Sequence, residues 1–374
     1  MAVLRYERDH DRMSVRDIAK HLRVTSPSYE GRSFWITWTL LAVVPAILIE
    51  GLYRLQVLNS YYYDVLMRTG IAVILAVSLN IVNGHLGQFS IGHAGFMGIG
   101  AYVSGVLIAG GNPGYAGVTL RQPGFLSSLP SANVLGYEIS LAFILAILIG
   151  GIAAAMLAFV IGIPAFRTKG DYLAVVTLAF NMIIVNIFVN MQYVGGARGL
   201  TGLPNYSNFL WVWFFLIVTL VVSRNLVTSA HGRAILSVRE NEVAAELGGV
   251  NTRKYKLIAL AVGAFFAGIG GALLGFHVMF INPNMFNVFK SIDLLIMIYL
   301  GGVGSITGTA LGAIVWTLLQ EALRFLGVWR LVLGPILLII VMIFWQRGLI
   351  KSELPFIIHR RKGGEAVVRD SQNR

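Results

Sequence analysis

Long apolar runs separated by short polar segments constrain this chain more than any other feature of its sequence. One run, FLWVWFFLIVTLVV, occupies residues 209–222, and another, LIALAVGAFFAGIGGALLGF, occupies residues 257–276. A helix needs about 20 apolar residues to cross the hydrocarbon core of a bilayer. Only 12% of the 374 residues are charged, against about a quarter in a soluble domain. We therefore expect an all-α polytopic membrane protein.

The apolar runs predict about ten membrane spans, within a range of eight to ten, and two of them are short. The N-terminus is too charged to be a cleavable signal peptide, so the first span would also direct insertion. The predicted spans are Phe34–Tyr53, Gly70–Val82, Phe96–Ala109, Ile139–Gly162, Tyr172–Val189, Phe209–Val227, Leu257–Phe280, Ser291–Leu300, Thr309–Leu326 and Leu331–Ile350.

Basic residues indicate which ends of the spans face the cytoplasm. A topology with both termini cytoplasmic places most of the 29 Lys and Arg residues inside. It predicts a cytoplasmic N-terminal tail at 1–33, a transmembrane domain at 34–350 with a cytoplasmic segment at 228–256, and a basic cytoplasmic tail at 351–374. In the N-terminal tail we expect an amphipathic helix on the membrane surface. Its apolar face would consist of Val15, Ile18, Ala19 and Leu22.

The longest charged stretch between the tails, HGRAILSVRENEVAAELGGVNTRKYK, occupies residues 231–256. Within it, Ser237-Val238-Arg239-Glu240 matches a capping box, which predicts that a helix begins at Ser237. Gly248-Gly249 can end that helix in a left-handed conformation, and Asn251 or Thr252 can cap the next one. The stretch therefore predicts a short soluble helix between two spans.

This predicted helix carries a small apolar face and a pair of carboxylates. Val243, Ala244 and Leu247 form the face, while Glu242 and Glu246 lie one turn apart on another side. Two carboxylates at this spacing repel slightly, so the stability of the helix alone does not explain them. They suit a surface that another protein recognises.

Two glycine-rich segments interrupt the apolar pattern. They are NGHLGQFSIGHAGFMGIGAY at residues 83–102 and GGVGSITGTALGA at residues 301–313. Such breaks are tolerated at membrane depth only where protein or a polar cavity covers the exposed backbone. Because the order of short span, break and small-residue span occurs twice, it suggests an internal repeat, as in many transporters. Chance is the alternative, since glycine is common in membrane helices.

His93 is the ionisable residue that the sequence places in a predicted break. An ionisable group inside a membrane is by default a functional candidate. The alternative, which we prefer, is a neutral histidine that satisfies loose backbone groups near the break.

The sequence offers little that could catalyse a reaction. It contains no Gly-Lys dipeptide, which excludes the phosphate-binding P-loop, and neither an HExxH nor a G-x-S-x-G motif. There is no cysteine, and the basic residues lie mostly in tails and loops, which argues against nucleic-acid binding. We expect no enzyme, no metal and no cofactor on this chain. Energy for uphill transport would come from another chain.

Five blocks, taken together, closely resemble the permease subunits of branched-chain amino acid ABC importers. They occur in the same order and cover roughly residues 65 to 350. The blocks are LNIVNGHLGQFSIGHAGFMGIGAY (79–102), RTKGDYLAVVTLAF (167–180), VGGARGLTGLP (194–204), RENEVAAELGGVN (239–251) with KLIALAVGAFFAGIGGALLG (256–275), and LGGVGSITGTALGA (300–313).

The resemblance implies a bacterial inner-membrane subunit that pairs with a second, homologous permease. It also implies two cytoplasmic ATP-binding subunits, which hold ATP and Mg, and an extracytoplasmic solute-binding protein. Transport would follow alternating access driven by the ATPases. Residues implied to couple to the ATPases are Arg239, Glu240, Glu242, Ala244, Ala245, Glu246 and Gly248, and residues implied near the translocation pathway are Gly92, His93, Gly95 and Gly98.

The chain departs from the family pattern at three positions. Asn181 and Asn186 stand where family members often have charged residues, and Thr309 replaces a common proline. These differences leave the substrate open between branched-chain amino acids and urea or short amides, whose importers share the permease architecture. A stand-alone secondary transporter or channel is a further alternative.

Overall fold

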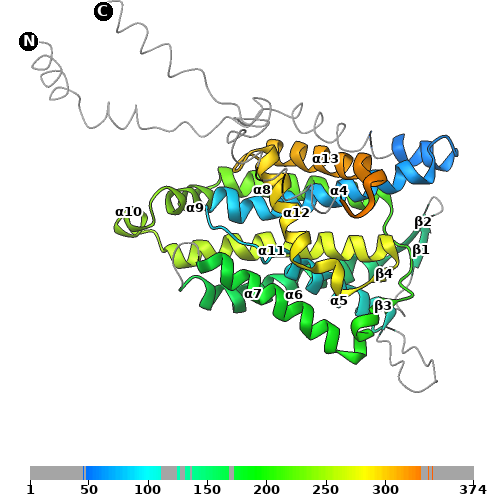
Figure 1. Cartoon of the computed structure of the whole chain (residues 1–374), viewed down its shortest axis with the longest axis horizontal. Helices are drawn as coiled ribbons and strands as arrows, with labels where there is room; N and C mark the ends of the chain where they lie inside the picture. Colours follow the sequence, from blue (N-terminus) through cyan, green and yellow to red (C-terminus); the bar gives the residue numbers. More distant parts are fainter. Residues whose placement is uncertain are drawn as a thin grey trace, which may run out of the picture. The chain divides into compact units, whose positions relative to one another are not determined.

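The computed structural model describes residues 48–110, 124–126, 131–134, 137–167 and 172–329, together with Pro45, Ile336 and Ile339. Met1–Pro45 groups as a separate unit, and the fold below is that of Ala46–Arg374. Residues 48–54 are helical. The longer helices are α4 Ser60–Asn80, α5 His93–Ala109, α6 Leu141–Ala165, α7 Tyr172–Asn190, α8 Phe209–Thr228, α9 Ala230–Glu240, α11 Thr252–Val278, α12 Val288–Gly301 and α13 Ile306–Ala322 (Figure 1).

Shorter elements connect these helices. The six-residue helix α10 covers Glu242–Leu247, and a π-helix, η1, continues α4 through Ile81–His85. The 3-10 turns are η2 Gln192–Val194, η3 Gly196–Arg198, η4 Pro283–Phe286 and η5 Leu323–Trp329. Four short strands form two antiparallel pairs, which the all-α prediction did not include. They are β1 Ser131–Val134 with β2 Tyr137–Ser140, and β3 Leu200–Thr201 with β4 Phe280–Ile281.

The described helices confirm a polytopic membrane protein. Seven of them are long and apolar enough to cross a membrane, and α5 is a shorter apolar helix. Together they match every predicted span from Gly70–Val82 to Thr309–Leu326. The outermost spans, Phe34–Tyr53 and Leu331–Ile350, lie mostly outside the described residues, as do the two tails and the predicted amphipathic helix. The total of ten spans and the cytoplasmic termini therefore remain predictions.

Two spans predicted to be short are longer in the structure. The helical segment that contains Gly70–Val82 runs from Ser60 to His85, and the one that contains Ser291–Leu300 runs from Pro283 to Gly301. The first turns of α4 contain Asp64 and Arg68. These two residues form an i,i+4 ion pair at 2.8 Å, which stabilises the helix.

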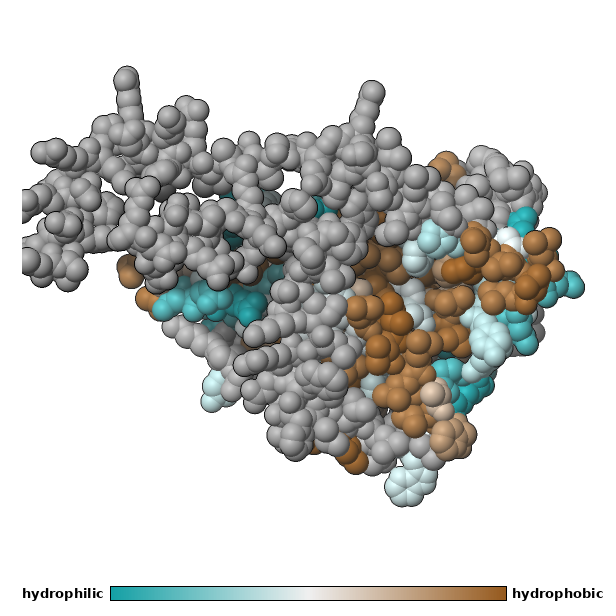
Figure 2. All heavy atoms as spheres, turned by 90° about the horizontal axis from the view of Figure 1, so that it is seen from above, coloured by the Kyte–Doolittle hydropathy of each residue, from teal (hydrophilic) through white to brown (hydrophobic). Residues whose placement is uncertain are grey.

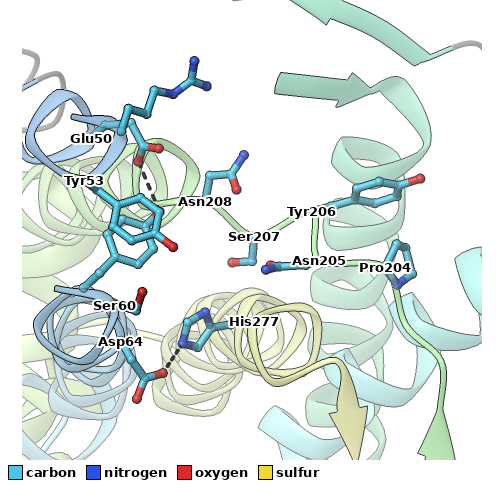
Figure 3. A pocket seen from close by; sticks show the side chains of 12 residues that line it. Glu50, Tyr53, Ser60, Asp64, Pro204, Asn205, Tyr206, Ser207, Asn208 and His277 are labelled. Carbon is cyan, nitrogen blue, oxygen red and sulfur yellow. Dashed lines mark hydrogen bonds and ion pairs between the residues drawn. The ribbon is translucent and has the colours of Figure 1, made fainter. Parts of the chain in front are cut away.

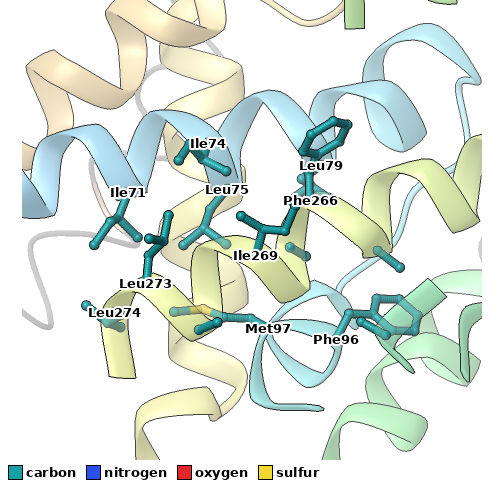
Figure 4. Close-up of a cluster of buried hydrophobic side chains, with 14 of the residues drawn as sticks. Ile71, Ile74, Leu75, Leu79, Phe96, Met97, Phe266, Ile269, Leu273 and Leu274 are labelled. Atoms are coloured by element: carbon teal, nitrogen blue, oxygen red, sulfur yellow. The ribbon is translucent and has the colours of Figure 1, made fainter. Parts of the chain in front are cut away.

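Helix α11 lies at the centre of the described fold, where it packs against α4, α5 and α6. Figure 4 shows side chains of α4 meeting those of α11, with Met97 of α5 on the other side of α11. Leu75, Ile269 and Leu273 are at most 1% exposed. Lipid tails are as apolar as these side chains, so close van der Waals packing, rather than exclusion of water, holds the helices together.

Three glycines let α5, α6 and α11 approach backbone to backbone. A Cβ on Gly100 would overlap the backbone of Gly268, and a Cβ on Gly150 would lie 2.7 Å from the carbonyl oxygen of Gly100. Small residues at such crossings are typical of membrane helix interfaces. The three helices therefore form one tightly packed group, which we call the glycine seam.

The outward faces of the spanning helices are apolar. On the face shown in Figure 2, apolar side chains gather over much of the described surface, with polar side chains at its edge. Ile152 and Met156 of α6, and Ile183 and Ile187 of α7, are each about half exposed. Such a surface suits lipid or the spans of another membrane subunit.

Gly100→Ala should destabilise the protein, because its new methyl group would overlap backbone atoms that cannot move aside. We expect a loss of about 1–3 kcal/mol or more, measured as a lower melting temperature in detergent. Gly51→Ala is the matched control, since a Cβ there meets no atom within 4 Å. An unchanged melting temperature for Gly100→Ala would contradict the glycine seam.

Candidate functional site

Two short helices, α9 and α10, form the polar segment between the spans α8 and α11, and we call them the elbow. Ser229 caps α9 by accepting a hydrogen bond from Gly232 N at 3.1 Å. Asn241 caps α10 by accepting one from Ala244 N at 3.0 Å. The topology predicted from basic residues places the elbow on the cytoplasmic side.

The prediction that a helix begins at Ser237 is wrong. Ser237 lies in the last turn of α9, and its hydroxyl donates to the carbonyl of Ala234 at 2.8 Å. The backbone instead becomes extended at Asn241, with φ −160° and ψ 109°, and an asparagine caps a helix as well as a serine does. The predicted end of the helix is confirmed, since Gly249 has φ 82° and Asn251 caps α11.

The two carboxylates of α10 bond to the start of α11. Lys256 Nζ lies 2.6 Å from Glu242 Oε1, and the Lys256 side chain is only 7% exposed. The hydroxyl of Thr252 donates to Glu246 Oε1 at 2.6 Å. These partners explain why two carboxylates stand one turn apart, in addition to the predicted recognition by another protein. They fix α10 to the long central helix.

The apolar face of α10 is exposed to its surroundings, as a docking surface would be. Val243 is 67% exposed and Leu247 is 85% exposed, while Ala245 is the buried residue that holds α10 in place. The remaining predicted coupling residues on this surface, Glu240, Ala244, Glu246 and Gly248, are also exposed. Large apolar side chains beside charged ones on a polar segment commonly mark a protein interaction site.

Arg239 connects the elbow to two helix breaks. The first break comprises residues 86–92, between η1 and α5, and the second comprises residues 302–305, between α12 and α13. A Cβ on Gly87 would lie 2.7 Å from Arg239 Cγ, and one on Gly304 would lie 2.9 Å from its Nη1. Both glycines have positive φ, 72° and 83°, so the Arg239 side chain packs on backbone that only glycine adopts readily.

Asn80, the last residue of α4, bonds this end of the helix to the second break. Its Nδ2 donates to the carbonyl of Ser305 at 3.1 Å, and its Oδ1 accepts from Gly304 N at 3.0 Å. Asn80 is fully buried, at 0% exposure. Its own carbonyl lies 3.2 Å from His85 Nδ1 in the π-helix η1. Backbone groups freed by the breaks are thus paired inside the protein, as membrane depth requires.

The loop from the first break into α5 is closed by side chains. Asn83 exchanges two hydrogen bonds of 3.2 Å with the backbone of Ser90. His93, 1% exposed, bonds through Nε2 to the Ser78 hydroxyl at 2.8 Å. We expected His93 to bond to backbone groups near the break. Its ring instead bonds to a side chain of α4, so the expected partner is wrong.

The predicted pathway glycines pack α5 against its neighbours. A Cβ on Gly92 would overlap the Thr177 carbonyl of α7, and one on Gly98 would lie 3.1 Å from the Phe286 ring. A Cβ on Gly95 would lie 3.0 Å from Asn181 Oδ1. The structure therefore brings Gly92, Gly95 and Gly98 together with His93 along one buried helix.

Two departures from the family pattern turn out to be buried and polar. Asn181 and Thr309 are each 0% exposed, and their side-chain polar atoms have no hydrogen-bond partner among the described residues. Unpaired polar groups at membrane depth are costly and often mark functional positions. The sequence predicted functional roles for Arg239 and Gly95, whereas no local sequence pattern predicts the hydrogen bonds of Asn80.

These observations define a class of protein. Helices long and apolar enough to span a membrane, with glycine-containing breaks between them that contact an exposed polar elbow, describe a multi-pass membrane permease. Among the described residues, His, Asp and Glu side chains form no cluster that could hold a metal ion.

Comparison with known proteins identifies the family. The family model for the permease component of branched-chain amino acid transport systems matches residues 61–345, so this chain belongs to that family. It is 28% identical over 327 residues to the high-affinity branched-chain amino acid transport system permease protein LivM of Escherichia coli (strain K12), covering 78% of this chain and 70% of that protein.

Two further relatives are more distant. A probable LivM permease of Methanocaldococcus jannaschii is 26% identical over 284 residues, covering 69% of this chain and 80% of the relative. The LivH permease of E. coli K12 is 24% identical over 248 residues, covering 65% of this chain and 78% of the relative. No solved structure matches the chain significantly.

Asn80→Ala should loosen the second break, because it leaves Gly304 N without its partner and removes one of the two hydrogen bonds that the Ser305 carbonyl accepts. We expect a loss of about 1–3 kcal/mol of stability, measured by thermal unfolding in detergent. Asn190→Ala removes an exposed asparagine that bonds only to Asn186 in its own helix, so it should unfold at the original temperature. Equal melting temperatures for the two variants would contradict the linking role of Asn80.

Proposed function

We propose that this chain is the membrane subunit of an ABC importer that carries branched-chain amino acids across the bacterial inner membrane. Membership of the permease family supports this proposal, and the exposed apolar face of α10 is the observation that carries its mechanism. ATP would be hydrolysed with Mg on two partner chains. A solute-binding protein would deliver substrate, and the similarity to both LivM and LivH supports a second, homologous permease in the complex.

The elbow would transmit the movement of the ATP-binding partners. A partner that holds Val243 and Leu247 would carry α10 with it. Glu242 and Glu246 then pass the displacement to α11 through Lys256 and Thr252. Arg239 passes it to both breaks. Packed elements of this kind switch between discrete positions, which is what alternating access requires.

The pathway would open along the side of α5 that contacts α7. Gly92, His93, Gly95 and Gly98 lie along α5, and Asn181 of α7 faces Gly95. When the helices separate, the unpaired Asn181 amide would gain a partner in the solute or its water. Glycine offers a smooth surface without bulky side chains, so binding there would be weak enough for release.

Leu247→Ser should weaken docking of the ATP-binding subunits, because the partner loses its most exposed apolar contact on α10. In proteoliposomes with all subunits, we expect transport to fall about tenfold, since burying one leucine contributes about 1.5–3 kcal/mol. Lys254→Ala, an exposed change in the first turn of α11, is the control. Full transport and full co-purification of the ATPase with Leu247→Ser would remove the elbow from the mechanism.

Reconstitution with and without the partners tests the function itself. Uptake of labelled leucine should require the ATPase subunits, ATP and the binding protein, and excess isoleucine should compete whereas excess urea should not. Competition by urea alone would identify an amide importer. Uptake by this chain alone along an ion gradient would identify a secondary transporter.

A further inference from the structure

A cavity of about 660 Å³ lies at the end of the fold opposite the elbow, and we call it the outer pocket (Figure 3). Helix α11 leaves the elbow at Thr252 and reaches the pocket at His277, so the two sites are about 40 Å apart. The predicted topology then makes the pocket extracytoplasmic. Its lining residues are Glu50, Tyr53, Arg54, Ser60, Tyr63, Asp64, Pro204, Asn205, Tyr206, Ser207, Asn208 and His277.

One wall of the outer pocket is acidic and aromatic. Glu50 is 6% exposed and accepts a hydrogen bond from the Tyr63 hydroxyl at 3.1 Å. Asp64 lies 2.7 Å from His277 Nε2. The rings of Tyr53 and Tyr63 stack with their centroids 4.0 Å apart. Carboxylates beside the faces of tyrosine rings attract an ammonium group.

The start of helix α8 adjoins this wall, since Phe209 N donates to the Tyr63 hydroxyl at 2.9 Å, and the neighbouring Ser207 suits an anion. Ser207 is 2% exposed, and its hydroxyl has no hydrogen-bond partner among the described residues. It immediately precedes the N-terminus of the 20-residue helix α8, where Asn208 makes no side-chain capping bond. A helix N-terminus carries a partial positive charge. A buried hydroxyl at this point can donate to a carboxylate.

We propose that the outer pocket binds the ammonium and carboxylate groups that all α-amino acids share. The carboxylate lies toward Ser207 and the start of α8, and the ammonium lies toward Glu50 and Asp64. The cavity is within the usual size range of a small-molecule site, about 300–1,000 Å³. This proposal rests on the proposed function and adds to it a site that binds the solute before translocation.

The lining residues give the outer pocket no means to distinguish one amino-acid side chain from another. Among its lining residues, Pro204 and the faces of the tyrosines are the apolar surfaces, so it holds no cavity shaped for a branched side chain. The outer pocket recognises the ammonium and carboxylate groups of the solute. Selection among amino-acid side chains is made by another component of the transporter. Leucine should therefore bind, while 3-methylbutylamine, 4-methylpentanoate and urea, which each lack one or both charges, should not.

Binding of labelled leucine to the full chain in lipid nanodiscs tests the proposal, with the two single-charge analogues and urea as competitors. Ser207→Ala should weaken leucine binding about tenfold, as expected for a hydrogen bond to a charged group. Ser223→Ala is the matched control, since Ser223 is an equally buried and unpartnered serine in α8 that does not line the pocket. Glu50→Gln should also weaken leucine binding, because it removes a carboxylate that attracts the ammonium group.

Each outcome separates the two proposals. Leucine affinity that is unchanged in both Ser207→Ala and Glu50→Gln would overturn the outer pocket, and so would urea competing as well as leucine. If the complete transporter still imports leucine in that case, the proposed function stands without the pocket. If the complete transporter imports no amino acid, the proposed function fails, whatever the nanodisc measurement gives.

Discussion

Every backbone polar group at membrane depth needs a partner inside the protein, and this requirement shapes the centre of the molecule. The chain breaks between helices at residues 86–92 and 302–305. Asn80, at the end of α4, pairs two backbone groups of the second break, because its carboxamide donates to the Ser305 carbonyl and accepts from Gly304 N. Asn83 does the same for Ser90 within the first break. Asparagine amides thus pair backbone groups at both breaks without placing a charge among them.

The elbow and the breaks form one connected structure rather than two separate features. Arg239 lies at the end of α9, yet its side chain rests on glycines of both breaks. Glu242 and Glu246 bond across to α11, which is also the central helix of the core. A displacement of the elbow can therefore reach the spanning helices by two routes. One route is through the contacts of Arg239 with the breaks, and the other is along α11.

The sequence predicted what local patterns determine, and missed what distant residues determine. Spans, the Gly249 turn and the Asn251 cap follow from hydropathy and from the conformational freedom of glycine. The helix start was misplaced because Ser237 and Asn241 both make good caps, and only the backbone direction chooses between them. The bond from Glu242 to Lys256 joins residues in different helices. The outer pocket collects side chains from three separate segments, so no window of sequence contains it.

The unbroken course of α11 has a thermodynamic consequence. One helix of 27 residues carries Lys256 at the elbow and His277 at the outer pocket, with the glycine seam holding its middle against α5 and α6. A ligand that favours one position of this rod also favours one position of the elbow. Linkage is reciprocal, so if a ligand at the outer pocket changes the affinity of the elbow for a partner, that partner changes the affinity of the pocket by the same factor.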